Sequence, residues 1–337
     1  MANTKERSAA QRREQIRQQR LRSDSQSTQQ QQAKTRKVRR TVRRSLNPWW
    51  YIGPILAVIV IIVGVFIYLA NQQGNVATTG VTDPTVLQQV THVSPALLSQ
   101  VGTADVKNNF QAVKQKQPIL LGPTGKPEIF YYGAEFCPLC AAERWGVVVA
   151  LSRFGTFTKL PEIASSPNDS YPNTATFSFY KSSYTSSYIN FVSVEAEDGQ
   201  RQQLQPTTPD QQKLVNAYDA PPYTQTTGYP FMDIGNQYIV NGPTYDPSVL
   251  AGLSQKDIAG QLSSADSASS RKILATANYI TAGVCAITNN QPTNVCSDPT
   301  IQQIEQAMPK ATANSGSSQL ASINGQPDLI APTRRKA

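Results

Sequence analysis

Two cysteines, Cys137 and Cys140, are separated by Pro138 and Leu139. Thiols at this spacing can exchange disulfides, because one thiolate attacks a substrate disulfide and the second thiol resolves the mixed disulfide that forms. We therefore predict that Cys137 is the nucleophile and that Cys140 is the resolving cysteine. In the alternative interpretation, the two cysteines form a permanent structural disulfide in a domain that only binds partners.

The residues around the pair predict how it is positioned. Residues 129–132 are apolar and aromatic, which is typical of a strand, Gly133 interrupts them, and residues 141–151 have the pattern of a helix. The pair then lies at a helix N-terminus, where unpaired N–H groups and the positive end of the helix dipole favour a thiolate. We therefore expect a lowered pKa for Cys137.

The motif at residues 137–140, directly after an aromatic strand, resembles the active site of the thioredoxin-like superfamily, and in particular its extracytoplasmic thiol-disulfide oxidoreductases. Residues 228–239 resemble the cis-proline loop of that superfamily with the two strands that follow it. The resemblance covers about residues 128–262. It implies an α/β, thioredoxin-like fold with insertions, in which Tyr229 and Pro230 lie across from the cysteines and bind the substrate backbone. The layout of the chain also resembles a prokaryotic family of membrane-anchored thioredoxin-like proteins of unassigned function.

Two departures from the thioredoxin pattern affect the expected chemistry. Phe136 stands where thioredoxin has tryptophan, and Pro138-Leu139 lacks the histidine of the strongest oxidants in the superfamily. The resemblance therefore implies an intermediate reduction potential.

Three charged residues lie close to the cysteines in sequence. We expect Glu135 and Glu143 to be exposed charges rather than proton acceptors for Cys140. Arg144 could support the Cys137 thiolate, but we expect it to lie on a solvated helix face.

The other two cysteines, Cys285 and Cys296, are separated by residues that favour turns. As a disulfide they would close a loop of about a dozen residues, which stabilises a fold by roughly 3 kcal/mol in the chain-entropy estimate. We predict this structural disulfide. The alternative is a second redox pair that relays electrons to or from the first.

A metal site is not expected. Cys285 and Cys296 lack the close spacing of a zinc knuckle, and thiolate-only sites are uncommon in oxidising compartments. Copper delivery would need a histidine or methionine beside the first pair, and only Met232 could approach it through the cis-proline loop. We predict no metal and no other cofactor.

The N-terminal part of the chain predicts a membrane anchor. Residues 1–47 hold 14 Lys or Arg and three Asp or Glu, a net charge of +11, whereas the remainder holds 17 basic and 19 acidic residues. Residues 49–70 contain no charge and are long enough to cross a bilayer. Basic residues on the N-terminal side place the tail in the cytoplasm and the rest of the chain outside the cell membrane. Contact with anionic lipid headgroups is then enough to explain the positive charge of the tail. We therefore predict no specific binding to nucleic acid.

These observations divide the chain into five parts: a disordered basic cytoplasmic tail (1–48), a single transmembrane helix (49–70), a linker and membrane-proximal spacer (71–117), an extracytoplasmic thioredoxin-like domain (118–309) and a flexible C-terminal tail (310–337). Within the domain we expect strands at 174–180 and 188–194 and helices at 208–218, 255–262 and 271–284. Residues 180–188 have no assignment.

The predicted function is that of a membrane-anchored thiol-disulfide oxidoreductase. Its predicted partners are thiols or disulfides of exported proteins, or a membrane redox partner, together with the lipid bilayer. The competing prediction is a non-enzymatic, membrane-tethered binding domain of the same fold with structural disulfides.

Overall fold

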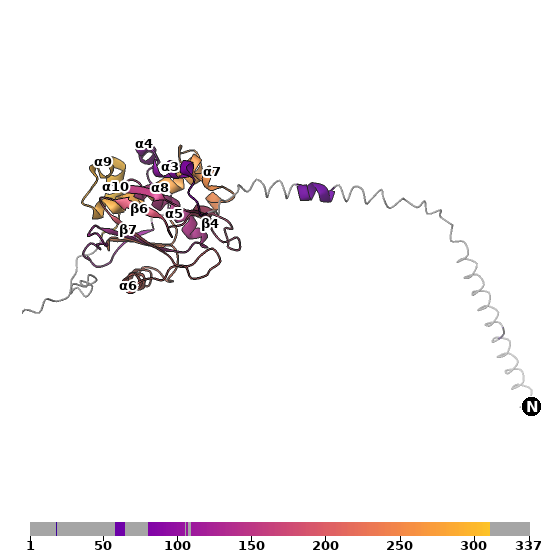
Figure 1. Cartoon of the computed structure of the whole chain (residues 1–337), viewed down its shortest axis with the longest axis horizontal. Coiled ribbons are helices and arrows are strands. Elements are labelled where there is room, and N and C mark those ends of the chain that lie inside the picture. The colour runs from indigo at the N-terminus through magenta and orange to yellow at the C-terminus, as the bar shows by residue number, and fades with distance from the viewer. Residues whose placement is uncertain (1–17, 19–57, 65–79, 105, 107–108, 311–337) are drawn as a thin grey trace, which may run out of the picture. The chain divides into compact units, whose positions relative to one another are not determined.

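The structure is a computed structural model that describes Gln18 and residues 58–64, 80–104, 106 and 109–310 (Figure 1). The chain divides into two units, Met1–Phe66 and Ile67–Ala337. In the first unit residues 58–64 are helical, and the apolar side chains of residues 58–63 are exposed.

Three predicted segments lie wholly or largely outside the described residues: the basic tail, the membrane span beyond residues 58–64, and the C-terminal tail after Lys310. Among the helices that the structure describes, none combines the length and the apolar character that crossing a bilayer requires.

The second unit is a mixed α/β domain, which confirms the predicted class. Its main sheet has five strands in the order β1-β9-β8-β2-β7. These are β1 (Phe110–Ala112), β2 (Glu128–Gly133), β7 (Asn190–Glu195), β8 (Phe231–Ile234) and β9 (Tyr238–Asn241). β2 runs parallel to β7 and antiparallel to β8, and β1, β9 and β8 are antiparallel neighbours.

Helices cover both faces of this sheet: α5 (Pro138–Leu151) and α8 (Ala268–Ile287) on one, α6 (Pro209–Tyr218) on the other. Successive side chains of β2 point to opposite faces of the sheet, so this strand contributes to the core on each face. Ile129 and Tyr131 join the core cluster of α5 and α8, whereas Phe130 joins a smaller cluster with Leu214 of α6.

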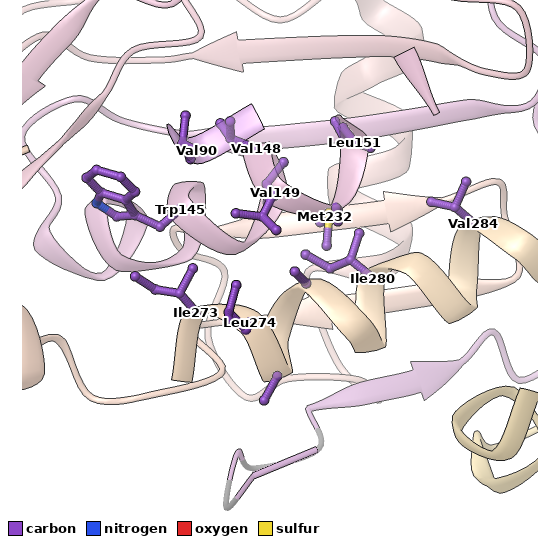
Figure 2. Packing of buried hydrophobic residues seen from close by; sticks show 14 of the residues in the cluster. Val90, Trp145, Val148, Val149, Leu151, Met232, Ile273, Leu274, Ile280 and Val284 are labelled. Atoms are coloured by element: carbon purple, nitrogen blue, oxygen red, sulfur yellow. The ribbon is translucent and has the colours of Figure 1, made fainter. Parts of the chain in front are cut away.

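The contact between α5 and α8 forms the centre of the larger core (Figure 2). Trp145 of α5 and Ile273 of α8 lie in this core, together with Met232 of β8. Gly146 is needed at the crossing, because a Cβ there would lie 2.4 Å from the Cγ2 of Thr276. Close packing of these two helices fixes the axis of α5, and therefore the place of its N-terminus.

The N-terminal part of the second unit packs on the domain. α3 (Pro84–Thr91) and α4 (Pro95–Val101) bury Val90 and Leu98 in the larger core, and β1 forms an edge of the main sheet. Short amphipathic helices are stabilised mainly by such tertiary packing. The segment after residue 83 is therefore part of the domain.

Between α5 and β7 the chain forms two small antiparallel sheets. One pairs β3 (Gly155–Lys159) with β6 (Ser183–Ser186), and the other pairs β4 (Glu162–Ala164) with β5 (Ala175–Phe177). β6 lies within residues 180–188, for which the sequence predicted no structure.

The C-terminal part of the domain is helical. It contains η1 (Pro247–Leu250), α7 (Gln255–Gln261), α8, α9 (Thr293–Cys296) and α10 (Pro299–Ala307). The sequence predicted α7 and α8 but neither of the last two helices. Buried Val295, Ile301 and Ile304 attach these two helices to the larger core.

Candidate active site

The first cysteine pair lies at the N-terminus of α5, as the sequence predicted. Cys137 is the N-cap residue and Pro138 is the first helical residue. The Cys137 sulfur accepts a hydrogen bond from the backbone N–H of Cys140 at 3.2 Å. Cys137 is 6% exposed, and Cys140 is fully buried beneath it. Both are free thiols.

The two thiols have opposite acidities. The pKa of Cys137 is held below its ordinary value, chiefly by a hydrogen bond from the Cys140 thiol and further by backbone N–H groups, against the opposing effect of burial. The pKa of Cys140 is raised well above its ordinary value, because burial disfavours its thiolate and the neighbouring Cys137 adds to the effect. Of the two thiols, Cys137 is therefore the more readily ionised.

Tyr229 and Pro230 lie beside Cys137, as the resemblance implied. The Tyr229–Pro230 peptide bond is cis, and the Cys137 thiol contacts the Tyr229 carbonyl at 4.0 Å. The Tyr229 ring packs edge-on against the rings of Tyr132 and Phe136, with centroids 5.1 and 6.2 Å away. Tyr229 therefore packs on the small cluster that contains Phe136 and both free cysteines.

A fully buried ion pair lies behind the cysteines. The Arg144 guanidinium donates to both carboxylate oxygens of Glu195, at 2.9 and 2.6 Å, and neither side chain is exposed. Its Nη2 also donates to the carbonyl of Ala134 at 2.7 Å. The expectation that Arg144 lies on a solvated helix face is therefore wrong, because its side chain is fully buried against Glu195 of β7.

The positive charge of Arg144 acts on both thiols. It lowers the pKa of Cys137 and opposes the rise in the pKa of Cys140. The phenol of Tyr131 lies nearby, with its ring centroid 6.0 Å from the Arg144 guanidinium carbon. Burial keeps this phenol neutral by raising its pKa well above the usual range.

The expectation of exposure is also wrong for Glu143. This side chain is 1% exposed, and its Oε2 accepts hydrogen bonds from the backbone N–H and the hydroxyl of Thr244, at 3.0 and 2.9 Å. Burial raises its pKa to about 7. Glu135 is half-buried and accepts a hydrogen bond from the Ser178 hydroxyl. Both glutamates thus have structural partners.

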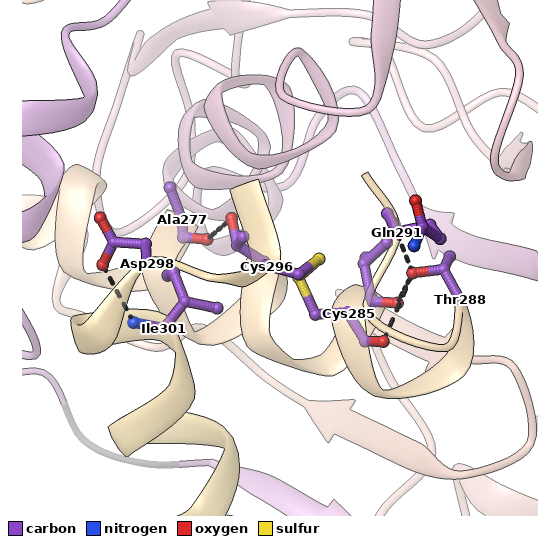
Figure 3. Close-up of a disulfide and its surroundings, with 9 residues drawn as sticks. Ala277, Cys285, Thr288, Gln291, Cys296, Asp298 and Ile301 are labelled. Carbon is purple, nitrogen blue, oxygen red and sulfur yellow. Dashed lines mark hydrogen bonds between the residues drawn. A yellow bond between two sulfur atoms is a disulfide. The ribbon is translucent and has the colours of Figure 1, made fainter. Parts of the chain in front are cut away.

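The second cysteine pair is a disulfide, as predicted, with both residues fully buried (Figure 3). It lies near the opposite end of β2 from the first pair. Gly235 donates its N–H to the Glu128 carbonyl, and a Cβ on Gly235 would lie 2.9 Å from the Cδ1 of Ile287, two residues after Cys285. Cys137 instead follows the other end of β2, and a six-residue strand spans about 17 Å. This placement argues against an electron relay between the two pairs.

No group of three or more potential metal-ligating side chains lies together in the described part of the chain. Met232 packs in the core of α5 and α8, whereas the free cysteines belong to a separate cluster with Ala134 and Phe136.

Sequence reasoning missed Glu195 and the buried state of Arg144. One signal was available: α5 is apolar on all sides, and Glu143 and Arg144 are its only charged residues. A helix of this kind is buried, so its charges need partners.

Comparison with known proteins identifies a family to which the chain belongs. A family profile described as "Domain of unknown function (DUF929)" matches residues 111–286, just over half of the chain. The chain belongs to this family. The matched region contains the free cysteine pair, Arg144, Glu195 and Pro230 but ends before Cys296. No curated protein and no solved structure matches the chain.

Proposed function

We propose that this chain is a membrane-anchored, extracytoplasmic thiol-disulfide oxidoreductase with a thioredoxin-like fold. Its substrates would be thiols or disulfides of exported proteins, or a membrane redox partner. The observation that carries the proposal is the asymmetry between Cys137, at the helix N-cap with a lowered pKa, and Cys140, buried beneath it with a raised pKa.

The order of the elements supports the fold. β2, α5, β7, α6, β8, β9 and α8 follow one another along the chain, and the sheet order β7-β2-β8-β9 has one parallel and two antiparallel pairings. This connectivity resembles that of the thioredoxin-like superfamily, with β3 to β6 as an insertion. The cis peptide at Tyr229–Pro230, directly before β8, occupies the corresponding loop.

The reaction would proceed in two exchanges. The Cys137 thiolate attacks one sulfur of a substrate disulfide, a bond forms between the two sulfurs, and the other substrate sulfur leaves as a thiolate that takes a proton from water. Cys140 then loses its proton and attacks the Cys137 sulfur, which releases the second substrate thiol and leaves a Cys137–Cys140 disulfide. The reverse sequence oxidises a substrate dithiol.

The uncharged run at residues 49–70 and the basic tail before it support the membrane anchor. The orientation follows from the tail and would place the cysteines where disulfides persist. A test is protease digestion of sealed vesicles, in which a domain on the outer side is accessible only from that side.

A second candidate function is a tethered binding domain whose first cysteine pair is a permanent disulfide. The low exposure of Cys137 favours it, because only 6% of the residue is open to a substrate. The lowered pKa of the Cys137 thiol argues against this second candidate, because a structural cysteine needs no acidic thiol.

Trapping with glutathione disulfide separates the two functions. On the full-length protein, Cys140→Ser should retain one glutathione at Cys137, because the resolving thiol is gone. Cys137→Ser should react far more slowly, and the wild-type protein should end as a Cys137–Cys140 disulfide without adduct. Mass spectrometry of the intact chain reads all three. Reaction of Cys140 as fast as Cys137, or of neither until the protein unfolds, would exclude the oxidoreductase.

A further inference from the structure

The loop that carries the nucleophile is tied to the buried arginine through one carbonyl. The Ala134 carbonyl accepts the backbone N–H of Cys137 at 3.3 Å and the Nη2 of Arg144 at 2.7 Å. Arg144 also lies four residues after Cys140 in α5, so the two side chains share one face of the helix. A single guanidinium thus contacts the nucleophile loop and shares a helix face with the resolving cysteine.

The arginine is held more firmly than a lone charge would be. Glu195 binds it through both oxygens, and Oε1 of Glu195 also accepts the backbone N–H of Phe179 at 3.2 Å. This bidentate geometry fixes the plane of the guanidinium. The position of the charge is therefore set by β7 and by the insertion, not by α5 alone.

Two polar atoms at this place lack partners. Nη1 of Arg144 and the hydroxyl of Tyr131 are buried and make no hydrogen bond within the described part of the chain. Gly133 leaves the room for that hydroxyl, because a Cβ on Gly133 would lie 2.7 Å from it. Unpaired buried donors are costly, so each of these two could donate to a thiolate that forms beside it.

The resolving exchange is a step that needs such a charge. Cys140 is fully buried, and its thiolate must form without solvent around it. The groups that face this place are Tyr131 from β2, Glu195 from β7 and Arg144 from α5, with Glu135 in the preceding loop. Of these, Arg144 alone is positive.

We propose that Arg144 is a positioning residue for the second exchange, supplying the buried positive charge against which the Cys140 thiolate forms while its contact with Ala134 keeps Cys137 in place. This inference rests on the proposed function. Atoms and electrons balance as in the two exchanges above, because the proton that Cys140 loses is matched by the one that the released substrate thiolate takes up.

The reagent 5,5′-dithiobis(2-nitrobenzoate) tests the two exchanges separately. The Cys137 thiolate attacks one sulfur of the reagent and releases a first coloured thiolate. Cys140 then attacks the Cys137 sulfur and releases a second one. Stopped-flow absorbance on the reduced, full-length protein gives a rate for each phase.

The decisive variant is Arg144→Met with Glu195→Met, which removes the ion pair without leaving one charge buried alone. We expect the second phase to slow severalfold, because the charge of Arg144 lowers the pKa of Cys140 by more than the charge of Glu195 raises it. The first phase should change less. Arg144→Lys keeps the charge, and its second phase should stay closer to that of the wild type.

The matched control is an exposed ion pair, Lys213 with Asp210 on α6, at 2.7 Å. Lys213→Met with Asp210→Asn should leave both phases unchanged. An unaltered ratio of the two phases in the folded methionine variant would overturn the inference, as would an equal loss in Arg144→Lys. If the wild-type protein shows no reaction before unfolding, the proposed function itself fails.

Discussion

The two cysteine pairs of this protein lie in different surroundings. Cys285 and Cys296 come from a helix end and a short helix, and both are fully enclosed by the larger core. Cys137 and Cys140 belong to a small separate cluster, with Cys137 at a helix N-cap and 6% exposed. The first arrangement encloses a disulfide, and the second lowers the pKa of one free thiol.

The two pairs differ in the groups that surround their sulfur atoms as well as in the spacing of the cysteines. A fixed cation and backbone N–H groups surround the free pair, whereas apolar side chains and backbone hydrogen bonds of the Thr288 hydroxyl surround the disulfide (Figure 3). Thiolates are the reactive species in disulfide exchange, so the proposed function depends on the groups that lower the pKa of Cys137.

Removal of one partner from the buried ion pair should have the largest effect on stability. Arg144→Met leaves the Glu195 carboxylate buried and unpaired, which costs about 3 to 5 kcal/mol for pairs of this kind. Urea unfolding of the reduced full-length protein measures it. A loss below about 1 kcal/mol would show that the charge beside the free cysteines is not fixed by this pair.

Loss of the disulfide should come next. Cys285→Ala with Cys296→Ala opens a loop with a sequence separation of 11, and the unfolded chain gains entropy worth about 3 kcal/mol. The reactivity of Cys137 should stay as in the wild type, measured by its rate of alkylation. A parallel loss of that reactivity would mean that the two pairs are coupled.

Removal of the free pair should cost less. Cys137→Ala with Cys140→Ala deletes two buried sulfur atoms, each comparable to a methylene, for about 1 to 2 kcal/mol in total relative to the reduced protein. Equilibrium unfolding under reducing conditions measures it. A cost equal to that of the disulfide variant would indicate that the free pair also has a structural role.

The exposed ion pair should matter least. Lys213→Met with Asp210→Asn should change the free energy of unfolding by about 0.5 kcal/mol or less, because its side chains are 61% and 52% exposed. Urea unfolding of this variant and of Arg144→Met compares the free energy lost with the exposed pair to that lost with the buried pair. A larger change would mean that α6 depends on this pair.

The sequence predicted the elements that local pattern specifies. β2, α5, α6 and the β8–β9 hairpin have clear signals, including the capping Thr208 and the turn at Gly235-Asn236. The prediction of the cysteine pair at a helix N-terminus is confirmed for the same reason, because strand, break and helix adjoin within a few residues.

Other features depend on contacts between distant residues. Arg144 and Glu195 are 51 positions apart, and only the parallel pairing of β2 with β7 brings them together. α3 and α4 lie in the segment predicted as a membrane-proximal spacer, and their buried side chains show that tertiary packing holds them on the domain. β6 is polar and exposed on alternate residues, so its pairing with β3 has little hydrophobic signal.

The most direct test of the central claim is the reduction potential of the Cys137–Cys140 pair in the full-length protein, measured together with the pKa of Cys137 from its alkylation rate against pH. Because the pKa of this thiol is lowered, the alkylation rate should level off at a lower pH than that of an ordinary thiol, whose pKa is about 8.5. The account predicts this behaviour with a potential between about −120 and −270 mV. A potential below about −300 mV, or a thiol that alkylates only in the unfolded protein, would contradict it and make the pair structural.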